Sequence, residues 1–219
     1  MIKVWDLWVR LFHWSLVITV GFLLVSGETG LGFFDWHKYA GEVALALVLF
    51  RLLWGVVGSS NASLLSLVVN PMVALSHLRD LLRRKPHQER GHNAAGGLAV
   101  IAMLALILVQ AGTGLFIADD EGWVEGALYG VFSVDISDTL YNLHHTVADL
   151  IKLLVIVHIV MIAMYYFVGR QNLFKPMITG KMQWLGDGEA PQIRFRHPLV
   201  GLFCAVVVFI GTALLINWF

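Results

Sequence analysis

The chain has 219 residues, of which 58% are hydrophobic and 14% charged, whereas soluble domains are about 45–50% apolar and about 25% charged. Its formal net charge is zero, which excludes a nucleic-acid-binding protein that relies on overall basicity. The single cysteine, Cys204, excludes an intramolecular disulfide framework and a cysteine-rich metal site. No Cys-x-x-Cys-His motif occurs, so haem attached through two thioethers is excluded as well. The composition indicates an integral membrane protein.

Five stretches are long and apolar enough to cross a bilayer, which takes roughly 20 residues. No small-residue cleavage site follows the first stretch, and it contains His13 and Trp14, so we expect a retained helix rather than a signal peptide. A sixth apolar run, Leu64 to Leu78, is shorter and is interrupted by Asn70-Pro71, which predicts an amphipathic segment on the membrane surface. We expect an all-α membrane protein of one domain, residues 1–219, with spans at about 11–27, 39–57, 94–117, 143–168 and 198–218.

The basic residues predict an orientation in the membrane. The 58–92 and 169–197 connections are rich in arginine and lysine, whereas the 118–142 connection has neither. Because positive loops stay inside and these connections alternate along the chain, we expect the N-terminus inside and the C-terminus outside. The outer connection instead carries six carboxylates, those of Asp119, Asp120, Glu121, Glu125, Asp135 and Asp138.

Histidines within predicted spans are functional candidates, because ionisable groups are costly at membrane depth. His144 and His158 are separated by a rise of roughly 21 Å and a rotation about 40° short of four full turns, so they share one helix face. His13 matches the depth of His158, and His37 matches the depth of His144. Two depth-matched imidazole pairs, one inner and one outer, are what two haem irons with axial histidines need. The alternative is a set of isolated histidines bonded to backbone carbonyls.

Three other residues compete for these sites or adjoin them. His145 is rotated by about 100° from His144 but lies 13 residues from His158, so it stays an alternative outer ligand. His92 and Asn93, at the inner start of the third span, are candidates to contact a quinone or a haem propionate. For His92, capping of the helix at the membrane interface is an equal alternative.

Basic side chains near the spans are candidates to bind haem propionates: Arg10, Arg51 and Lys152. Arg51 lies near the inner end of the second span, where it could instead extend its charged head to the surface. Lys152 lies between the two histidines of the fourth span, and it could instead pair with Asp149 three residues earlier, or serve a proton path.

Several motifs together resemble the bacterial di-haem cytochrome b membrane proteins, the group that holds prokaryotic cytochrome b561 and the b-type subunits of nickel-iron hydrogenases and formate dehydrogenases. Leu-His-His and Val-His in the fourth span match the family's ligand spacing and favour His144 over His145. In the third-span motif, alanine stands where the family usually has proline, and a fifth helix follows the usual four. The other matching segments are Val-Trp-Asp (4–6), Arg-Leu-Phe-His-Trp (10–14), Asp-Trp-His-Lys-Tyr-Ala-Gly (35–41), Arg-Leu-Leu-Trp-Gly-Val-Val-Gly-Ser (51–59), Gly-His-Asn-Ala-Ala-Gly (91–96) and Gln-Ala-Gly-Thr-Gly-Leu-Phe (110–116).

The resemblance implies a four-helix haem-binding bundle with a fifth C-terminal helix, in a bacterial inner membrane with the N-terminus cytoplasmic and the C-terminus periplasmic. It also implies two non-covalent b haems that relay electrons between the quinone pool and a small oxidant or a redox partner, such as a c-type cytochrome. One alternative is a membrane subunit of a hydrogenase or dehydrogenase complex. An alternative of another class is a haem-free anchor or transporter. The acidic 118–142 connection predicts an outer docking surface for a cationic partner, although acidic residues also accumulate on outer loops for topological reasons.

Overall fold

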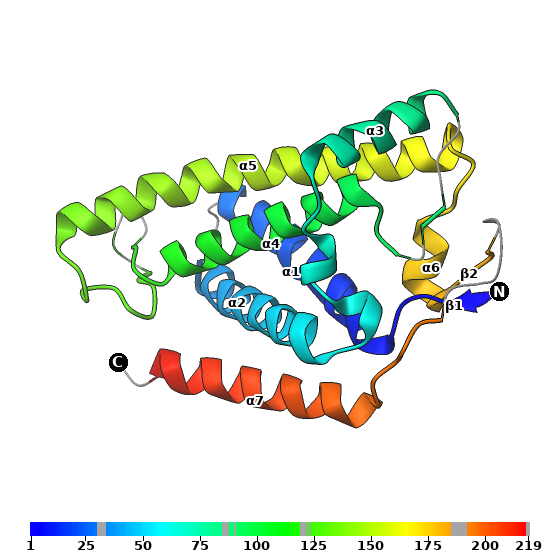
Figure 1. Cartoon of the computed structure of the whole chain (residues 1–219). Helices are drawn as coiled ribbons and strands as arrows, with labels where there is room; N and C mark the ends of the chain where they lie inside the picture. Colours follow the sequence, from blue (N-terminus) through cyan, green and yellow to red (C-terminus); the bar gives the residue numbers. More distant parts are fainter. Residues whose placement is uncertain are drawn as a thin grey trace. The chain divides into compact units, whose positions relative to one another are not determined.

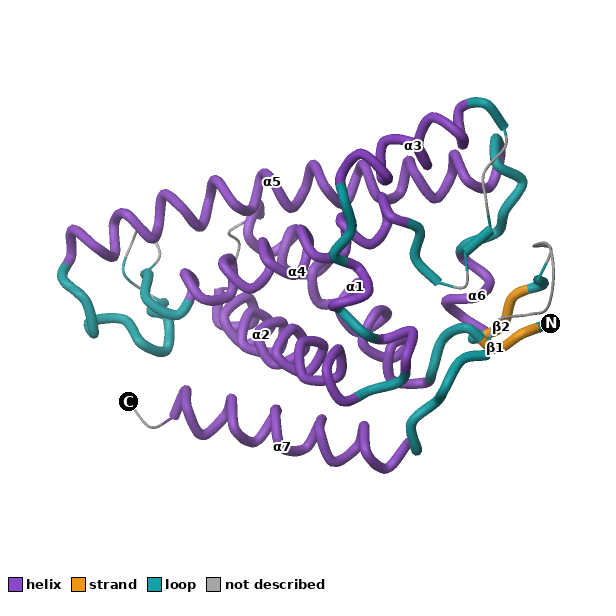
Figure 2. Tube along the Cα trace, in the orientation of Figure 1, coloured by secondary structure: helices purple, strands orange, loops and turns teal. Residues whose placement is uncertain are grey.

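The fold is almost entirely helical. The computed structural model describes residues 1–29, 34–84, 88–89, 91–118, 122, 124–184 and 192–217. The described residues form seven α-helices and two short strands. Figure 1 colours them along the sequence, and Figure 2 shows the two strands near the N-terminus. The all-α prediction is confirmed.

Five helices in the described part of the chain are long and apolar enough to cross a membrane, as predicted. At a rise of about 1.5 Å per residue, even the shortest, of 20 residues, spans the hydrocarbon layer of about 30 Å. The helices are α1 (Leu7–Thr29), α2 (Phe34–Val57), α4 (Ala94–Gly114), α5 (Val134–Phe167) and α7 (Pro198–Asn217).

Helix α5 extends beyond the predicted fourth span at its N-terminal end. Helix α5 has 34 residues and begins at Val134 rather than about residue 143, so Asp135 and Asp138 belong to the helix and not to the connection before it. Apolarity marks only the part of a helix that can lie in lipid, whereas backbone hydrogen bonds continue into water. Acidic residues also favour a helix N-terminus through the helix dipole. Helices α1 and α2 likewise begin about four and about five residues before the predicted spans.

The apolar run after α2 forms short elements and no span. The 3₁₀ turns η1 (Ser60–Ala62) and η2 (Leu65–Leu67) precede α3 (Pro71–Leu82). Asn70 caps α3 by accepting a hydrogen bond from the backbone N–H of Met72, at 2.9 Å. Met72 and Leu75 are exposed while Leu81 is fully buried. A short helix therefore begins directly after Asn70, and its position on the membrane surface stays a prediction.

The chain divides into two compact units, and each long helix contributes residues to both. The first unit is residues 1–12, 51–103 and 154–202, and the second is residues 13–50, 104–153 and 203–217 of the described chain. The division falls within helices rather than at linkers. The single domain over residues 1–219 stays a prediction.

The first unit has a buried polar core around Asp6, the residue before α1. Its carboxylate accepts hydrogen bonds from the backbone N–H of Val9, at 2.8 Å, and from the indole N–H of Trp54, at 3.2 Å. Asp6 and Trp54 are 6% and 1% exposed. One carboxylate therefore caps α1 and ties it to α2.

The same unit holds the N-terminal strand against the segment before α7. Strand β1 (Ile2–Lys3) pairs antiparallel with β2 (Lys181–Met182), which follows α6 (Phe174–Thr179). Gly180 ends α6 with φ of 75°, and a Cβ there would lie 2.8 Å from the carbonyl oxygen of Trp5. Glycine is required at this position both by the left-handed backbone and by the close approach.

We predict that Asp6→Ala lowers the free energy of unfolding by about 1–3 kcal/mol, because a helix cap is lost and the buried indole N–H of Trp54 loses its acceptor. The measurement is denaturant unfolding of the purified protein in detergent micelles.

The matched control is Asp135→Ala, which removes an exposed carboxylate from the first turn of α5. Its effect is expected to stay within about 0.5 kcal/mol. Equal losses for the two variants would mean that the bonds to Val9 and Trp54 contribute nothing beyond helix-terminus charge.

Candidate functional site

Two of the predicted ligands, His37 and His144, face each other within the second unit. His37 lies in the first turns of α2 and His144 ten residues into α5. Their ring centroids are 6.5 Å apart and their ring planes are inclined at 66°. Both side chains are half-buried. The predicted outer pair is therefore brought together by the fold.

Each of these imidazoles has a hydroxyl at Nδ1. Ser26 Oγ, in the last turns of α1, is 2.8 Å from His37 Nδ1. Thr113 Oγ1, near the end of α4, is 3.0 Å from His144 Nδ1. The hydroxyls come from two helices and the histidines from two others, so four helix segments define the site.

Each of the two hydroxyls also donates a hydrogen bond to a backbone carbonyl of its own helix. Ser26 Oγ donates to the carbonyl of Phe22, at 2.8 Å, and Thr113 Oγ1 donates to that of Gln110, at 2.9 Å. A hydroxyl has one proton, so each oxygen accepts from its imidazole. This arrangement matches the tautomer with the ring proton on Nδ1, in which the lone pair on Nε2 is available to a metal.

A glycine follows each hydroxyl residue and makes room for the ring. A Cβ built on Gly27 would lie 3.2 Å from Cε1 of His37, and one built on Gly114 would lie 3.2 Å from Cε1 of His144. Such contacts are tighter than ordinary packing, so any larger residue would push the imidazole. The dipeptides Ser26-Gly27 and Thr113-Gly114 thus hold their rings in the same way.

His144 and its sequence neighbour His145 differ in how far each side chain is buried. On α5 the less exposed positions recur at three- and four-residue intervals from His144 through Val147 and Ile151 to His158, so the two predicted ligands do share a helix face, as expected from their spacing. His145 is exposed and lies against Tyr141, with ring centroids 4.5 Å apart. The geometry around His37 therefore involves His144 rather than His145.

The predicted inner pair is divided between the two units. His13 is half-buried on α1 in the second unit, and its ring lies edge-on to Trp14 at a centroid distance of 5.0 Å. His158 is half-buried on α5 in the first unit. Neither unit contains both histidines, so their pairing stays a prediction.

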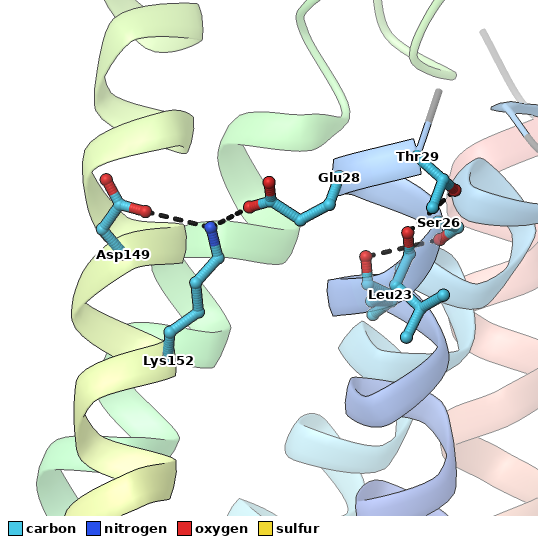
Figure 3. Close-up of polar contacts among 7 residues, drawn as sticks. Leu23, Ser26, Glu28, Thr29, Asp149 and Lys152 are labelled. Atoms are coloured by element: carbon cyan, nitrogen blue, oxygen red, sulfur yellow. Dashed lines mark hydrogen bonds and ion pairs between the residues drawn. The ribbon is translucent and has the colours of Figure 1, made fainter. Parts of the chain in front are cut away.

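Lys152 lies in a cluster of charges, as Figure 3 shows. Its ammonium contacts the carboxylate of Asp149 at 3.0 Å, the i, i+3 pairing predicted as one alternative, and also the carboxylate of Glu28 in the last turn of α1. Glu28 and Asp149 are exposed. Because the ammonium of Lys152 already contacts two carboxylates, it has fewer N–H donors left for a haem propionate. Binding of a propionate by Lys152 stays a prediction.

Arg51 and Arg10 both bond to backbone carbonyls in the first unit. Arg51 is 3% exposed and donates to the carbonyl of Ala62 at 2.8 Å, so its head is turned into the protein and not toward the membrane surface. Arg10 donates to the carbonyl of Ile178 at 2.6 Å and thereby ties α1 to the end of α6. Each thus has a structural partner, and its role at a propionate stays a prediction.

His92 and Asn93 lie at the start of α4 in the first unit. The side-chain Oδ1 of Asn93 accepts a hydrogen bond from the backbone N–H of Gly96 at 2.8 Å, which caps the helix, and its side-chain amide donates to the hydroxyl of Tyr165. The His92 ring lies 4.8 Å from the Trp5 ring. Asn93 therefore has a clear structural role, and quinone contact by either residue stays a prediction.

The acidic connection is described only in part. Asp119, Asp120 and Glu121 lie outside the described residues. Glu125 forms a β-bridge with Ala118, and the backbone N–H of Leu128 donates to the carbonyl of Leu115 at 2.7 Å. The segment after α4 therefore folds back onto the end of that helix, next to Thr113 and Gly114.

Comparison with protein families identifies the chain. The model of the family described as prokaryotic cytochrome b561 matches residues 4–180, which includes α1 to α6. The chain belongs to the prokaryotic cytochrome b561 family. It is therefore a multi-pass membrane protein of a prokaryotic family, and membership implies b-type cytochrome electron transfer. A comparison with curated proteins and one with solved structures give no significant match.

The cytochrome b561 family implies haem b, and the His37–His144 site fits it. An imidazole nitrogen bonds a first-row metal at about 2 Å, so two imidazoles on opposite sides of one iron have ring centres about 6 Å apart, close to the 6.5 Å observed. Among the described residues no group of three or more His, Cys, Asp or Glu is placed to hold a metal ion. Two protein ligands are too few for a structural zinc site but are the usual number for a haem iron in an electron-transfer protein.

Sequence reasoning missed the supporting residues of this cytochrome b561 site. Thr113 and Gly114 were noted only as part of a motif, and Ser26 and Gly27 were not singled out. The available signal was a hydroxyl residue followed by glycine near the outer end of two spans. Small residues in spans also serve helix packing, so only the contacts to His37 and His144 distinguish the two uses.

We predict that Gly114→Ala lowers the haem content of the purified protein toward one haem per chain, because the new Cβ would press on the His144 ring and ligand geometry tolerates only about 0.5 Å of error. Gly112→Ala is the matched control in the same turn of α4, since nothing lies within 4 Å of its Cβ position. Haem content is measured by the pyridine haemochrome spectrum per mole of chain.

Gly112→Ala should keep full haem content and gain up to about 1 kcal/mol in helix stability. Equal haem content in the two variants would contradict the role of Gly114 as the space for His144.

Proposed function

We propose that the chain is a transmembrane electron carrier that holds two b haems, one near each membrane surface. His37 and His144 are the axial ligands of the outer haem, and His13 and His158 those of the inner haem. The observation that carries the proposal is the pair of imidazoles in the second unit, with ring centroids 6.5 Å apart and each Nδ1 bonded to a hydroxyl. We infer that Nε2 of each ring is the atom that binds the iron. The inner pair is supported by the shared face of His144 and His158 on α5.

Haem, when bound, supplies a one-electron iron couple whose potential depends on axial ligands, burial and nearby charge. The residues of the chain hold and orient it. Ser26 and Thr113 fix the two outer ring tautomers, and Gly27 and Gly114 leave space beside the rings. Membrane helices that bury these groups limit water at the site, which favours neutral imidazoles over charged ones.

We also propose that the chain exchanges electrons with the quinone pool, and that His92 and Asn93 contact the quinone. We also assign the N-terminus to the cytoplasm and the C-terminus to the periplasm of a bacterial inner membrane, on the alternation of basic and acidic connections. A redox partner is either a c-type cytochrome at the acidic outer connection or a hydrogenase or dehydrogenase subunit at the basic inner face. Clustered carboxylates attract and steer a cationic partner, which favours the c-type cytochrome. The acidic outer connection also lies in the sequence directly between Thr113-Gly114 and His144.

We predict that His37→Ala and His144→Ala each remove about one of the two haems per chain, because an iron that loses an axial imidazole loses its hold on the protein. The measurement is the reduced-minus-oxidised spectrum of the b-type α-band with haem quantified per chain. His145→Ala, on the exposed neighbour of His144, is the matched control and should keep both haems.

Loss of the outer haem in His145→Ala but not in His144→Ala would overturn the ligand assignment. A protein purified from haem-replete membranes without any b-type α-band would overturn the haem proposal itself and leave an anchor or transporter.

We predict that replacing Asp119, Asp120, Glu121 and Glu125 by their amides flattens the salt dependence of electron exchange with a basic c-type cytochrome, because surface attraction is screened over about 10 Å at 0.1 M salt. The measurement is the stopped-flow rate of cytochrome reduction across a series of ionic strengths. Asp80→Asn with Glu89→Gln, on a basic connection, is the control and should leave the slope unchanged. An unchanged slope for the outer variant would place the partner on the inner face.

A further inference from the structure

We propose that Ser26 and Thr113 are positioning residues that set the tautomer and the electron-donating strength of His37 and His144, and through them the potential of the outer haem. The inference rests on the proposed function, because it needs a haem at this pair. It goes further by naming side chains that do not touch the iron. Each hydroxyl acts together with the glycine that follows it.

The first argument is the repetition of one arrangement on two helices. In α1 and in α4 a hydroxyl residue bonds the imidazole Nδ1 of another helix, and the next residue is a glycine whose Cβ position is 3.2 Å from Cε1 of the same ring. For each ring the hydroxyl bonds Nδ1, and the glycine, which has no side chain, leaves the space that the ring occupies. A hydroxyl that served only its own helix would need no adjacent glycine at the ring.

The second argument is burial. Ser26 and Thr113 are 2% and 6% exposed. Four other threonines donate their hydroxyl proton to the carbonyl four residues earlier but are exposed. Backbone bonding of this kind is therefore common on these helices, whereas burial against an imidazole distinguishes Ser26 and Thr113. The four exposed residues are Thr29, Thr139, Thr146 and Thr179.

The third argument is chemical. An acceptor on Nδ1–H makes the imidazole a stronger donor to its metal, and a carboxylate would do so most strongly. A carboxylate at membrane depth is costly, however. A hydroxyl already bonded to a backbone carbonyl accepts the Nδ1 proton while adding no charge to the site. The arrangement therefore gives two neutral imidazoles with enhanced donor strength, which favours oxidised over reduced iron.

The test is a redox titration of the b-type α-band in Ser26→Ala and Thr113→Val. Each variant removes a hydroxyl and changes the shape of the side chain little, because alanine is serine without its oxygen and valine has nearly the shape of threonine. The outer component of the titration is identified as the one absent from His144→Ala. Losing one acceptor should raise the ratio of reduced to oxidised outer haem, measured at the wild-type midpoint, about threefold to tenfold. The low-spin ferric EPR signal of the outer haem should shift in the same variants.

Matched controls distinguish the loss of the bond to the imidazole from a general effect of removing a hydroxyl from a helix. Thr29→Val, in the last turn of α1, and Thr146→Val, two residues after His144 on α5, remove exposed hydroxyls that donate to a backbone carbonyl and that bond to no imidazole among the described residues. Both should leave the potential and the EPR signal unchanged. Thr113→Ser restores the hydroxyl and should restore the wild-type potential. If Thr113→Val loses the outer haem altogether, retention of that haem by Thr113→Ser supports the same conclusion.

Two failures are distinguishable. If His37→Ala and His144→Ala keep both haems, the proposed outer site is wrong and the inference falls with it. If those variants lose the outer haem while Ser26→Ala and Thr113→Val keep the wild-type potential and EPR signal, the site stands and only the role of the hydroxyls is overturned. Loss of haem from both Thr113→Val and Thr113→Ser would also overturn it, because space rather than the hydroxyl would then decide.

Discussion

The constraint on which the rest of the structure depends is that polar groups inside a membrane need partners within the protein. Helices satisfy their own backbone in this way, which is why spanning segments are helical. Side chains follow the same rule here. Ser26 and Thr113 bond to carbonyls of their own helices, and Arg51 bonds to a loop carbonyl. Lys152 has two carboxylates. These side chains are thus held in pairs and relays.

Such relays also carry chemical information. A hydroxyl whose proton is committed to a carbonyl can only accept from an imidazole, so helix geometry decides which ring nitrogen is protonated. At His37 and His144 the hydroxyls lie at Nδ1, which matches the tautomer with the proton on that nitrogen. In that tautomer the lone pair of each ring is on Nε2, the nitrogen that has no bond to the hydroxyl.

Membership of the prokaryotic cytochrome b561 family and the geometry of the outer pair support each other. The family implies haem b, and the pair supplies two ligands at a suitable separation with no third ligand placed nearby among the described residues. Helix α7 follows the region that the family model matches. The buried bonds of Asp6 to Val9 and Trp54 serve a different end, because they hold α1 to α2 in the first unit.

The sequence by itself determined the membrane class, the five spans, the amphipathic segment after Asn70-Pro71 and the shared face of His144 and His158, because apolar length and helical periodicity are local properties. It left His145 open beside His144, and it offered Arg51 a position at the surface. Only the tertiary structure decided these points, because each depends on what another helix presents: burial of Arg51 against Ala62, or of His144 against Thr113 and His37. It also revealed Ser26-Gly27 and Thr113-Gly114 as partners of the histidines, since a bond between residues far apart in the chain leaves no periodic trace in the sequence.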